Sequence, residues 1–253
     1  MFFKNRNRKS QKSTGRVIRF IPDSPRAESI LEPPSPASRN TPEWYRKLNK
    51  YVVPEIKCSR YPDKDATPNN TNFTAKACKP LLDSFMTGYM VTLPTDVTAV
   101  TDEAYEARMI WDSNTNMIET HAMAQLDGLQ APDEYEPSPY KWNFHWAIKV
   151  PEGYSLIYTH PFNRIDLPFY TMTGVVDADT YGVPVNLPFF LKKDFAGLIP
   201  KGTPVAQLIP IKREEWEHHI GTLSDYNVFE AEAMKLYMGG GYKKMYWSPK
   251  KYR

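Results

Sequence analysis

One stretch, residues 174–213, constrains the fold most strongly because it contains two strand patterns separated by turn residues. From Val183 to Leu191, apolar side chains recur at every second residue, which is typical of a strand with one buried face. Residues 199–203, Ile-Pro-Lys-Gly-Thr, have the composition of a tight turn, and residues 205–211 are apolar except for Gln207. Strand patterns dominate the downstream two thirds of the chain, so we expect an all-β sandwich or barrel.

The length of the chain, 253 residues, favours one core with appendages. Residues 1–42 are basic and rich in proline, which predicts an extended arm. Residues 43–84 read as a short helix and a loop that lead into the main domain. A Gly-rich, aromatic and basic segment ends the chain, so we expect residues 214–253 to form a helix followed by a second arm.

The charge distribution and the cysteine content limit the kinds of partner and of stabilising site that we expect. The net charge is +3, but basic residues cluster at both ends, where they are able to contact nucleic acid or another anionic surface. Solvated tails are an equally good interpretation of those ends. Two cysteines do not make a disulfide framework or a cysteine metal cluster. The sequence shows no secretory signal and no membrane span, which predicts a soluble protein, or part of a soluble assembly, that is neither secreted nor inserted into a membrane.

Local patterns predict several further elements. Residues 17–21 are apolar enough to add an edge strand, and residues 142–150 and 154–158 predict two strands. Thr41 and Pro42 predict a capped helix that runs to about residue 50. Four aromatic residues are candidates for contact with a partner, with packing on the chain's own domain as the alternative: Trp44, Tyr45, Tyr246 and Trp247.

Four segments together carry a family resemblance. Residues 174–179, Gly-Val-Val-Asp-Ala-Asp, resemble the third motif of the dUTPase superfamily, which includes dUTPases and dCTP deaminases. Residues 201–209 look like its fourth motif, residues 150–154 like the approach to its second, and residues 87–91 like its first. The resemblance implies a distorted jelly-roll barrel of dUTPase type, β-clip-like, over residues 85–213. It also implies a homotrimer whose C-terminal arms cross between subunits.

The resemblance also assigns candidate site residues. Asp177 stands at the position of the water-activating carboxylate, with Asp179 beside it. Tyr181 lies one residue from the position of the sugar-discriminating aromatic, and Gln207 matches the polar residue of the fourth motif. Gly240 and Gly241 resemble the fifth motif, a Gly-rich arm that closes over phosphates.

Two of the family's positions have changed. Met90 stands where the first motif has an aspartate, and residues 159–164 lack the serine pair that holds the phosphates. Losing one positioned donor costs about 3–4 kcal/mol of transition-state stabilisation. The sequence therefore indicates a catalytically degenerate member of the superfamily that needs no cofactor. In that case Asp177 and Asp179 cap a turn, and Gln207 binds buried backbone.

Residues 35–48 and 160–169 are also similar to uncharacterised proteins of tailed bacteriophages. This resemblance implies a location in the virion or the host cytoplasm. Arms around a compact barrel are typical of virion proteins, so we expect a non-enzymatic structural or assembly protein that binds other virion proteins. The alternative is a divergent nucleotide triphosphate hydrolase or nucleotide-sensing protein that uses Mg²⁺. Nucleic-acid binding through the basic arms is a third interpretation.

Overall fold

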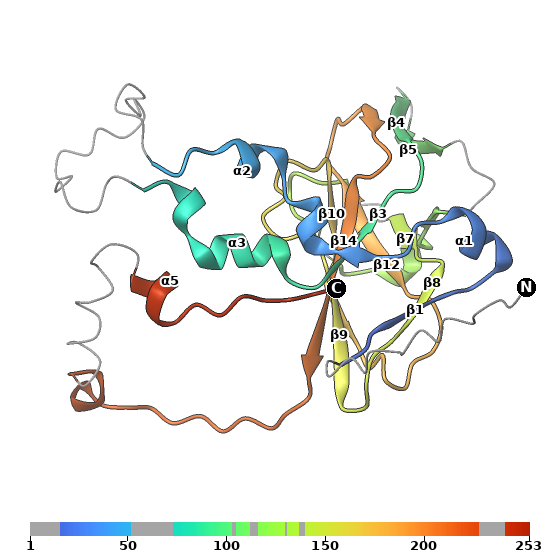
Figure 1. The fold of residues 1–253 in the computed structure, drawn as a ribbon. Helices are drawn as coiled ribbons and strands as arrows, with labels where there is room; N and C mark the ends of the chain where they lie inside the picture. Colours follow the sequence, from blue (N-terminus) through green and yellow to red (C-terminus); the bar gives the residue numbers. More distant parts are fainter. Residues whose placement is uncertain are drawn as a thin grey trace, which may run out of the picture.

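The computed structural model describes residues 16–51, 73–102, 105–111, 116–129, 131–136, 140–227 and 241–253. Its strands form four sheets, and its helices are few and short, so the all-β expectation is confirmed (Figure 1). The strands from β3 to β14 lie between residues 89 and 212. Among the described residues, no helix is both long enough and apolar enough to cross a membrane.

The central sheet has the strand order β11-β9-β14-β3-β2, with neighbouring strands antiparallel. Its long strand, β14, is buried from Pro204 to Leu208, because it pairs with β9 on one edge and β3 on the other. The bounds of the five strands are β2 Ser35–Pro36, β3 Tyr89–Thr92, β9 Tyr154–Thr159, β11 Gly174–Val176 and β14 Pro204–Lys212.

A second sheet, with the order β10-β12-β7-β6, supplies the aromatic part of the core. The rings of Trp142 and Phe189 stack with their centroids 3.6 Å apart, and Trp142 Nε1 donates a hydrogen bond to Thr171 Oγ1 (3.0 Å). Each such fully buried side chain stabilises the fold by about 1.5–3 kcal/mol relative to an exposed one. The strands are β6 Ile118–Thr120, β7 Tyr140–Asn143, β10 Phe169–Thr171 and β12 Asn186–Leu191.

Two smaller sheets complete the β structure. In the first, β1 (Arg19–Pro22) pairs antiparallel with β8 (Trp146–Lys149), which confirms that the apolar patch near the N-terminus adds an edge strand. The second has the order β13-β4-β5, formed by Gly197–Ile199, Val97–Asp102 and Tyr105–Trp111.

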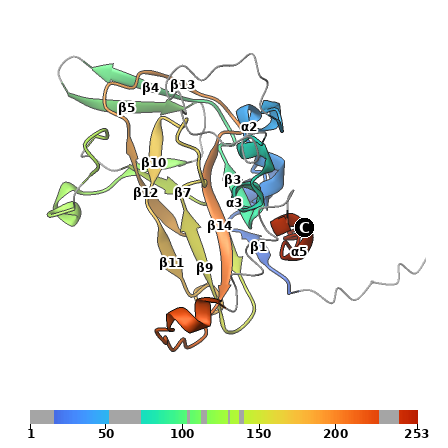
Figure 2. The same ribbon diagram turned by 90° about the vertical axis from the view of Figure 1, so that its left-hand side faces the viewer.

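Short helices lie mainly on one side of the sheets, as Figure 2 shows for α2 and α3. Helical segments among the described residues include α1 Pro25–Ile30, η1 Ala37–Asn40, α2 Glu43–Lys47, η2 Ala75–Ala77, α3 Lys79–Met86, η3 Met123–Leu126 and α5 Gly241–Met245. Residues 223–227 are also helical.

Two local expectations were wrong, and a third was confirmed in part. Thr41 does not cap α2, because its hydroxyl donates to Ser38 O (3.0 Å); Pro42 occupies the cap position, and the helix ends at Lys47. The expected strand over residues 142–150 is two strands. It breaks at residues 144–145, where His145 O accepts from Asp23 N (3.0 Å) and His145 Nδ1 pairs with Asp23 Oδ2 (2.9 Å). The prediction that residues 214–236 are helical in part is confirmed at residues 223–227; residues 214–222 are not helical, and residues 230–236 lie outside the described residues.

Candidate functional site

A turn directly after β11 carries the two carboxylates that the sequence singles out, Asp177 and Asp179. The main-chain oxygen of Asp177 closes the turn by accepting from the amides of Thr180 (3.0 Å) and Tyr181 (2.9 Å). Ala178, between the two carboxylates, is 1% exposed and belongs to the core. The buried alanine therefore anchors the turn and fixes both acidic residues beside the neighbouring strand, β9.

Arg213, the residue that follows β14, binds both carboxylates. Its Nη1 lies 3.2 Å from Asp177 Oδ1 and 3.1 Å from Asp179 Oδ1, and its Nη2 donates to Asp179 Oδ2. Ser155 Oγ donates to Asp177 Oδ1 (2.6 Å), and the amide of Gly153 donates to Asp179 Oδ2 (2.9 Å). We call these four side chains, from Ser155, Asp177, Asp179 and Arg213, the Arg213 cluster. The strand order explains it, because β9 lies between β11 and β14 and brings their ends together.

Electrostatics in the Arg213 cluster disfavour base catalysis. The hydrogen bond from Arg213 is the main cause that lowers the pKa of Asp179 to about 2, and Asp179 in turn raises the pKa of the guanidinium. The Asp179 side chain is 5% exposed, whereas that of Asp177 is 62% exposed. A general base works best with a pKa near the working pH. A carboxylate held ionised by an arginine is better suited to fastening the turn.

Gln207 is fully buried in β14, and both ends of its amide are bonded to main chain. Its Oε1 accepts from the amide of Phe162 (2.9 Å). Its Nε2 donates to the carbonyl oxygens of Ser84 (2.9 Å) and Thr87 (2.6 Å). One side chain thus joins the end of α3 to the loop after β9. This matches the interpretation in which Gln207 binds buried backbone.

The structure does not bring Gln207 and the carboxylates together within one chain. Gln207 pairs with Thr159 in the β9–β14 register, whereas Ser155, the partner of Asp177, lies four residues earlier on β9. Four strand residues span about 13 Å. The motif residues therefore form two separate groups, each bonded to its own part of the fold.

His160 opens the loop at the position of the family's phosphate-binding turn. Its Nδ1 accepts from the amide of Thr171 (3.3 Å), and its Nε2 donates to the carbonyl of Arg164 (3.1 Å). Burial lowers the pKa of His160, so the ring is neutral at pH 7. Both ring nitrogens are therefore engaged in holding the loop. Met90, at the position of the missing aspartate, is 4% exposed and part of the buried interior.

Of the remaining ligand candidates, the structure describes Tyr181 and Gly241. Tyr181 follows the turn and is 47% exposed. Gly240 lies outside the described residues, and Gly241 begins the short helix α5. Only Tyr181 is therefore placed near the Arg213 cluster.

Two of the aromatic candidates pack on α3. The Tyr45 ring is 1% exposed, and its centroid lies 4.8 Å from that of Phe85. Trp44 lies edge-on to Phe85 at 5.7 Å but remains 42% exposed. In this structure Tyr45 is buried within its own chain, whereas Trp44 keeps an exposed face.

The last residues of the chain lie alongside α3 and β3 (Figures 1 and 2). Asp83 Oδ2 accepts from Trp247 Nε1 (2.9 Å) and from Lys250 Nζ (2.8 Å). Tyr252 lies edge-on to Tyr89 at 5.8 Å. Tyr246, one residue before Trp247, is 46% exposed. These contacts attach residues 247–252 to α3 and β3 of the same chain.

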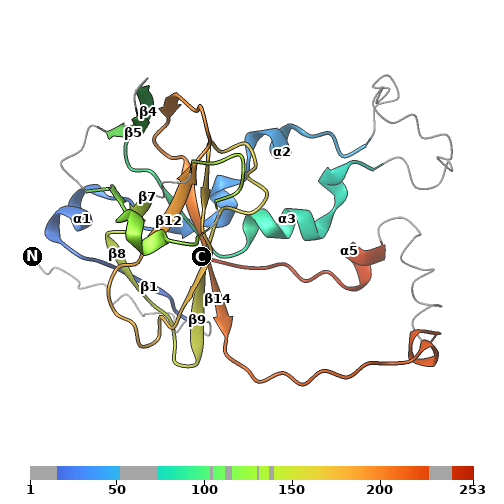
Figure 3. The ribbon, with the colours of Figure 1, turned by 180° about the vertical axis from the view of Figure 1, so that it is seen from behind.

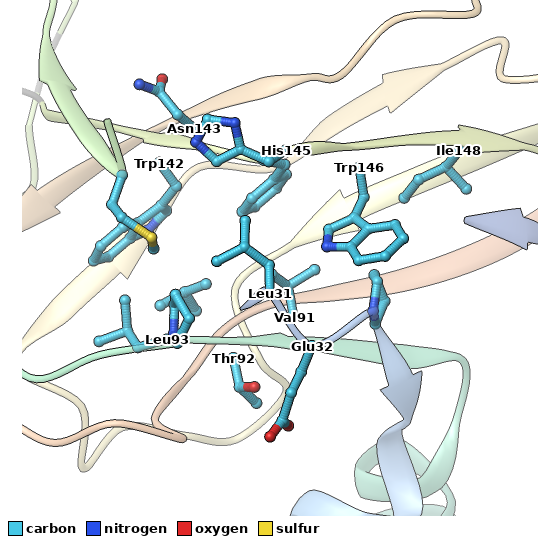
Figure 4. Close-up of a pocket in the computed structure, with 15 residues that line it drawn as sticks. Leu31, Glu32, Val91, Thr92, Leu93, Trp142, Asn143, His145, Trp146 and Ile148 are labelled. Carbon is cyan, nitrogen blue, oxygen red and sulfur yellow. The ribbon is translucent and has the colours of Figure 1, made fainter. Parts of the chain in front are cut away.

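A small apolar pocket lies between β3, β7, β8 and the segment after α1 (Figure 4). Its volume is about 40 Å³, and Leu31, Val91 and Trp146 are among its walls. The indole nitrogen of Trp146 faces the pocket and is buried without a hydrogen-bond partner among the described residues. No sequence pattern pointed to this pocket, because its walls come from segments as far apart in the sequence as Leu31 and Val205.

Sequence analysis also did not single out Arg213. The available signal was an arginine that ends an apolar strand pattern, in the same stretch as an acidic turn. Among the described residues, no cluster of three or more histidine, cysteine, aspartate or glutamate side chains is arranged to hold a metal ion. Comparison of the chain with protein-family models finds no match, and comparison with curated proteins finds none either.

Proposed function

We propose that the chain is a non-enzymatic structural or assembly protein of a bacteriophage particle. In this proposal, a barrel of dUTPase-like, jelly-roll type forms each subunit, and terminal arms join the subunits into a homotrimer. The resemblance to proteins of tailed bacteriophages supports the virion assignment. The chain acts by packing against neighbouring subunits, and the Arg213 cluster catalyses no reaction.

The observation that carries the proposal is the exposure of large apolar side chains on the segment after β14. Residues 213–227 leave the central sheet and extend away from it (Figure 3). Four large apolar side chains on this segment are exposed: Trp216 (85%), Ile220 (93%), Leu223 (75%) and Tyr226 (58%). Several large apolar side chains exposed on one short segment mark that segment as a candidate interaction site. An extended arm with spaced apolar anchors fits insertion into a neighbouring subunit.

The arrangement of the motif-like segments supports a dUTPase-like barrel. Residues 87–91, 174–179 and 201–209 overlap β3, β11 and β14, and residues 150–154 lead into β9. These strands are consecutive neighbours in one sheet, in the order β11-β9-β14-β3. Segments that are far apart in sequence therefore meet, as a shared family core requires.

The bonding of the motif residues supports a non-enzymatic role. The amide of Gln207 has no unused end, and Asp179 is paired with Arg213. Catalysis of phosphate chemistry relies on donors that remain available to the substrate. The nucleotide-hydrolase alternative requires these residues to release contacts that hold the fold.

Light scattering after size-exclusion chromatography tests the arm directly. We expect the full chain to elute with the mass of a trimer. The double variant Trp216→Ser, Ile220→Ser removes two of the exposed anchors and is expected to shift the mass to that of a monomer. The matched control is Ile165→Ser, which removes an 87% exposed apolar side chain from the barrel and leaves the arm intact.

A monomeric full chain would contradict the arm-mediated assembly, as would a double variant that keeps the mass of the full chain. Circular dichroism at the same concentration establishes that the variant is folded. The virion assignment has its own readout, mass spectrometry of purified particles. The proposal predicts a fixed copy number per particle, and absence of the chain from particles would refute it.

A further inference from the structure

An open groove lies at the end of the barrel where α2 approaches the turn between β13 and β14 (Figure 2). Its walls come from three segments, residues 39–46, 164–168 and 192–204, and its volume is about 700 Å³. A volume of several hundred Å³ is typical of sites that hold a bound compound. Neither the carboxylates of the Arg213 cluster nor Gln207 is part of its lining.

The groove carries an excess of positive charge. Its lining contains five cationic side chains and two carboxylates, which leaves three positive charges uncompensated. The cationic residues are Arg39, Arg46, Arg164, Lys192 and Lys201, and the acidic residues are Glu43 and Asp166.

Both carboxylates of the groove, those of Asp166 and Glu43, already form ion pairs. Asp166 forms a two-point ion pair with Arg164, through Nε and Nη2 at 2.9 Å each. Burial alone would raise the pKa of Asp166, but the hydrogen bonds and charge of Arg164 outweigh it and lower that pKa. Glu43 pairs with Lys47 (2.7 Å), which is not part of the lining.

Four cations consequently have no carboxylate partner in the described part of the chain: Arg39, Arg46, Lys192 and Lys201.

These cations project from main chain that is fixed in place. Arg39 belongs to η1, where Ala37 is fully buried and its amide donates to Gly88 O (3.0 Å). Arg46 belongs to α2, which the buried ring of Tyr45 holds against α3. A fixed backbone lowers the entropic cost of ordering the side chains on a ligand.

The main chain of the lining segment formed by residues 192–204 is also fixed in place. The Lys201 amide donates to Asp96 Oδ1 (2.7 Å), and the next amide, that of Gly202, donates to Leu93 O (2.8 Å). Lys192 Nζ donates to Ile165 O (3.3 Å), which leaves the ammonium free to make further hydrogen bonds. Cationic side chains from residues 39–46 and from residues 192–204 thus line the groove.

We propose that this groove binds a compound with several linked phosphate groups. Guanidinium groups match phosphate oxygens with paired hydrogen bonds, and lysines add point charges. Cations that come from separate lining segments suit a ligand whose charges are spread along a chain. Linked phosphates occur in the backbone of nucleic acid and in free polyphosphates, and the test below distinguishes these sources. The site adds a ligand to the proposed assembly role and does not depend on the arm.

Fluorescence anisotropy of the full chain with a labelled single-stranded oligonucleotide measures the interaction, and sodium tripolyphosphate serves as competitor. The groove variant is Arg39→Glu, Arg46→Glu, Lys201→Glu. The matched control, Lys193→Glu, Lys243→Glu, Lys244→Glu, changes the net charge equally at exposed lysines outside the groove. Thermal unfolding of both variants verifies that they are folded.

The groove variant is expected to lose at least about tenfold in affinity, and its logarithmic salt slope is expected to fall by about 2, or roughly 0.7 for each lost phosphate contact. The control variant is expected to stay within about threefold of the unchanged chain, since exposed cations away from the ligand contribute little. Displacement of the oligonucleotide by tripolyphosphate identifies the shared phosphate site. If tripolyphosphate stabilises the chain in a groove-dependent way and the oligonucleotide does not bind, the ligand is a free polyphosphate.

Three results would overturn the proposal. The first is equal weakening in the groove and control variants, which would indicate a nonspecific charge effect. The second is retention of full affinity for both probes by the groove variant. The third is competition by a glutamate polymer as strong as that by tripolyphosphate at equal charge, which would assign the groove to acidic peptides.

Discussion

Gln207 lies at the point where three segments of main chain meet, and its environment explains its place in the apolar strand. Its amide is bonded to Ser84, Thr87 and Phe162, all of which depend on it for a partner inside the barrel. A polar side chain in this position is therefore a structural connector between α3, β14 and the loop after β9.

Substitution Gln207→Leu is expected to lower the free energy of unfolding by about 3 kcal/mol, because it leaves buried main-chain donors and acceptors without partners. Urea denaturation followed by circular dichroism measures this change. The control Gln125→Leu, at an exposed position, is expected to change stability by less than about 0.5 kcal/mol. A loss below about 1 kcal/mol for Gln207→Leu would mean that the connector role is incorrect.

The pH dependence of stability gives a second test at the residue scale. The pKa of Asp179 is about 2 in the folded chain, against about 3.9 for an unfolded aspartate. The folded state therefore holds fewer protons in this range, so the contribution is present above about pH 4 and is lost as the pH falls towards about 2. Asp179→Asn is expected to be less stable than the unchanged chain at pH 6, and the difference is expected to shrink as the pH falls.

Urea titrations at pH 6, 4 and 3 measure that difference. Asp127→Asn, at an exposed site outside the Arg213 cluster, is the control and is expected to show no such convergence. A constant difference between Asp179→Asn and the unchanged chain over this pH range would show that the pair with Arg213 does not affect stability.

At the scale of elements, two glycines of the motif-like segments have different physical roles. Gly88, before β3, has φ +75°, and a Cβ there would lie 2.0 Å from the carbonyl oxygen of Leu208 on β14. Gly202, in the turn before β14, has φ +82°, but a Cβ there would meet nothing within 4 Å. Close strand contact requires the first glycine, whereas only the turn conformation requires the second.

Gly88→Ala is consequently expected to cost at least about 3 kcal/mol, because β3 and β14 must separate to admit the methyl group. Gly202→Ala is expected to cost about 1–2 kcal/mol, the strain of a left-handed conformation alone. Thermal or urea unfolding of the two variants measures both values. Equal costs would show that the close approach at Gly88 is not a constraint on the sheet.

At the scale of the whole molecule, local patterns predict the strands better than their assembly. Alternation predicts β12, and the turn at residues 199–203 follows from Pro and Gly preferences. The break between β7 and β8 was not predictable. It depends on Asp23, which is more than a hundred residues away from His145 in the sequence. Contacts made by partners distant in sequence leave no local pattern.

The candidate site follows the same rule. Sequence analysis identified Asp177, Asp179 and Gln207, and one of its two interpretations gave them structural roles. Arg213 binds both carboxylates, and its place beside them depends on strand order. The groove was harder still to predict from the sequence, because residues 39–46 line it only through the packing of η1 and α2.

We propose that the motif-like residues hold the fold and perform no nucleotide chemistry. Incubation of the purified chain with dUTP or dCTP and Mg²⁺, followed by chromatographic separation of the products, tests it directly. We predict no monophosphate, pyrophosphate or deaminated product above the rate without protein. Product formation that Asp177→Asn abolishes in a folded variant would contradict the claim and would restore the Arg213 cluster as an active site.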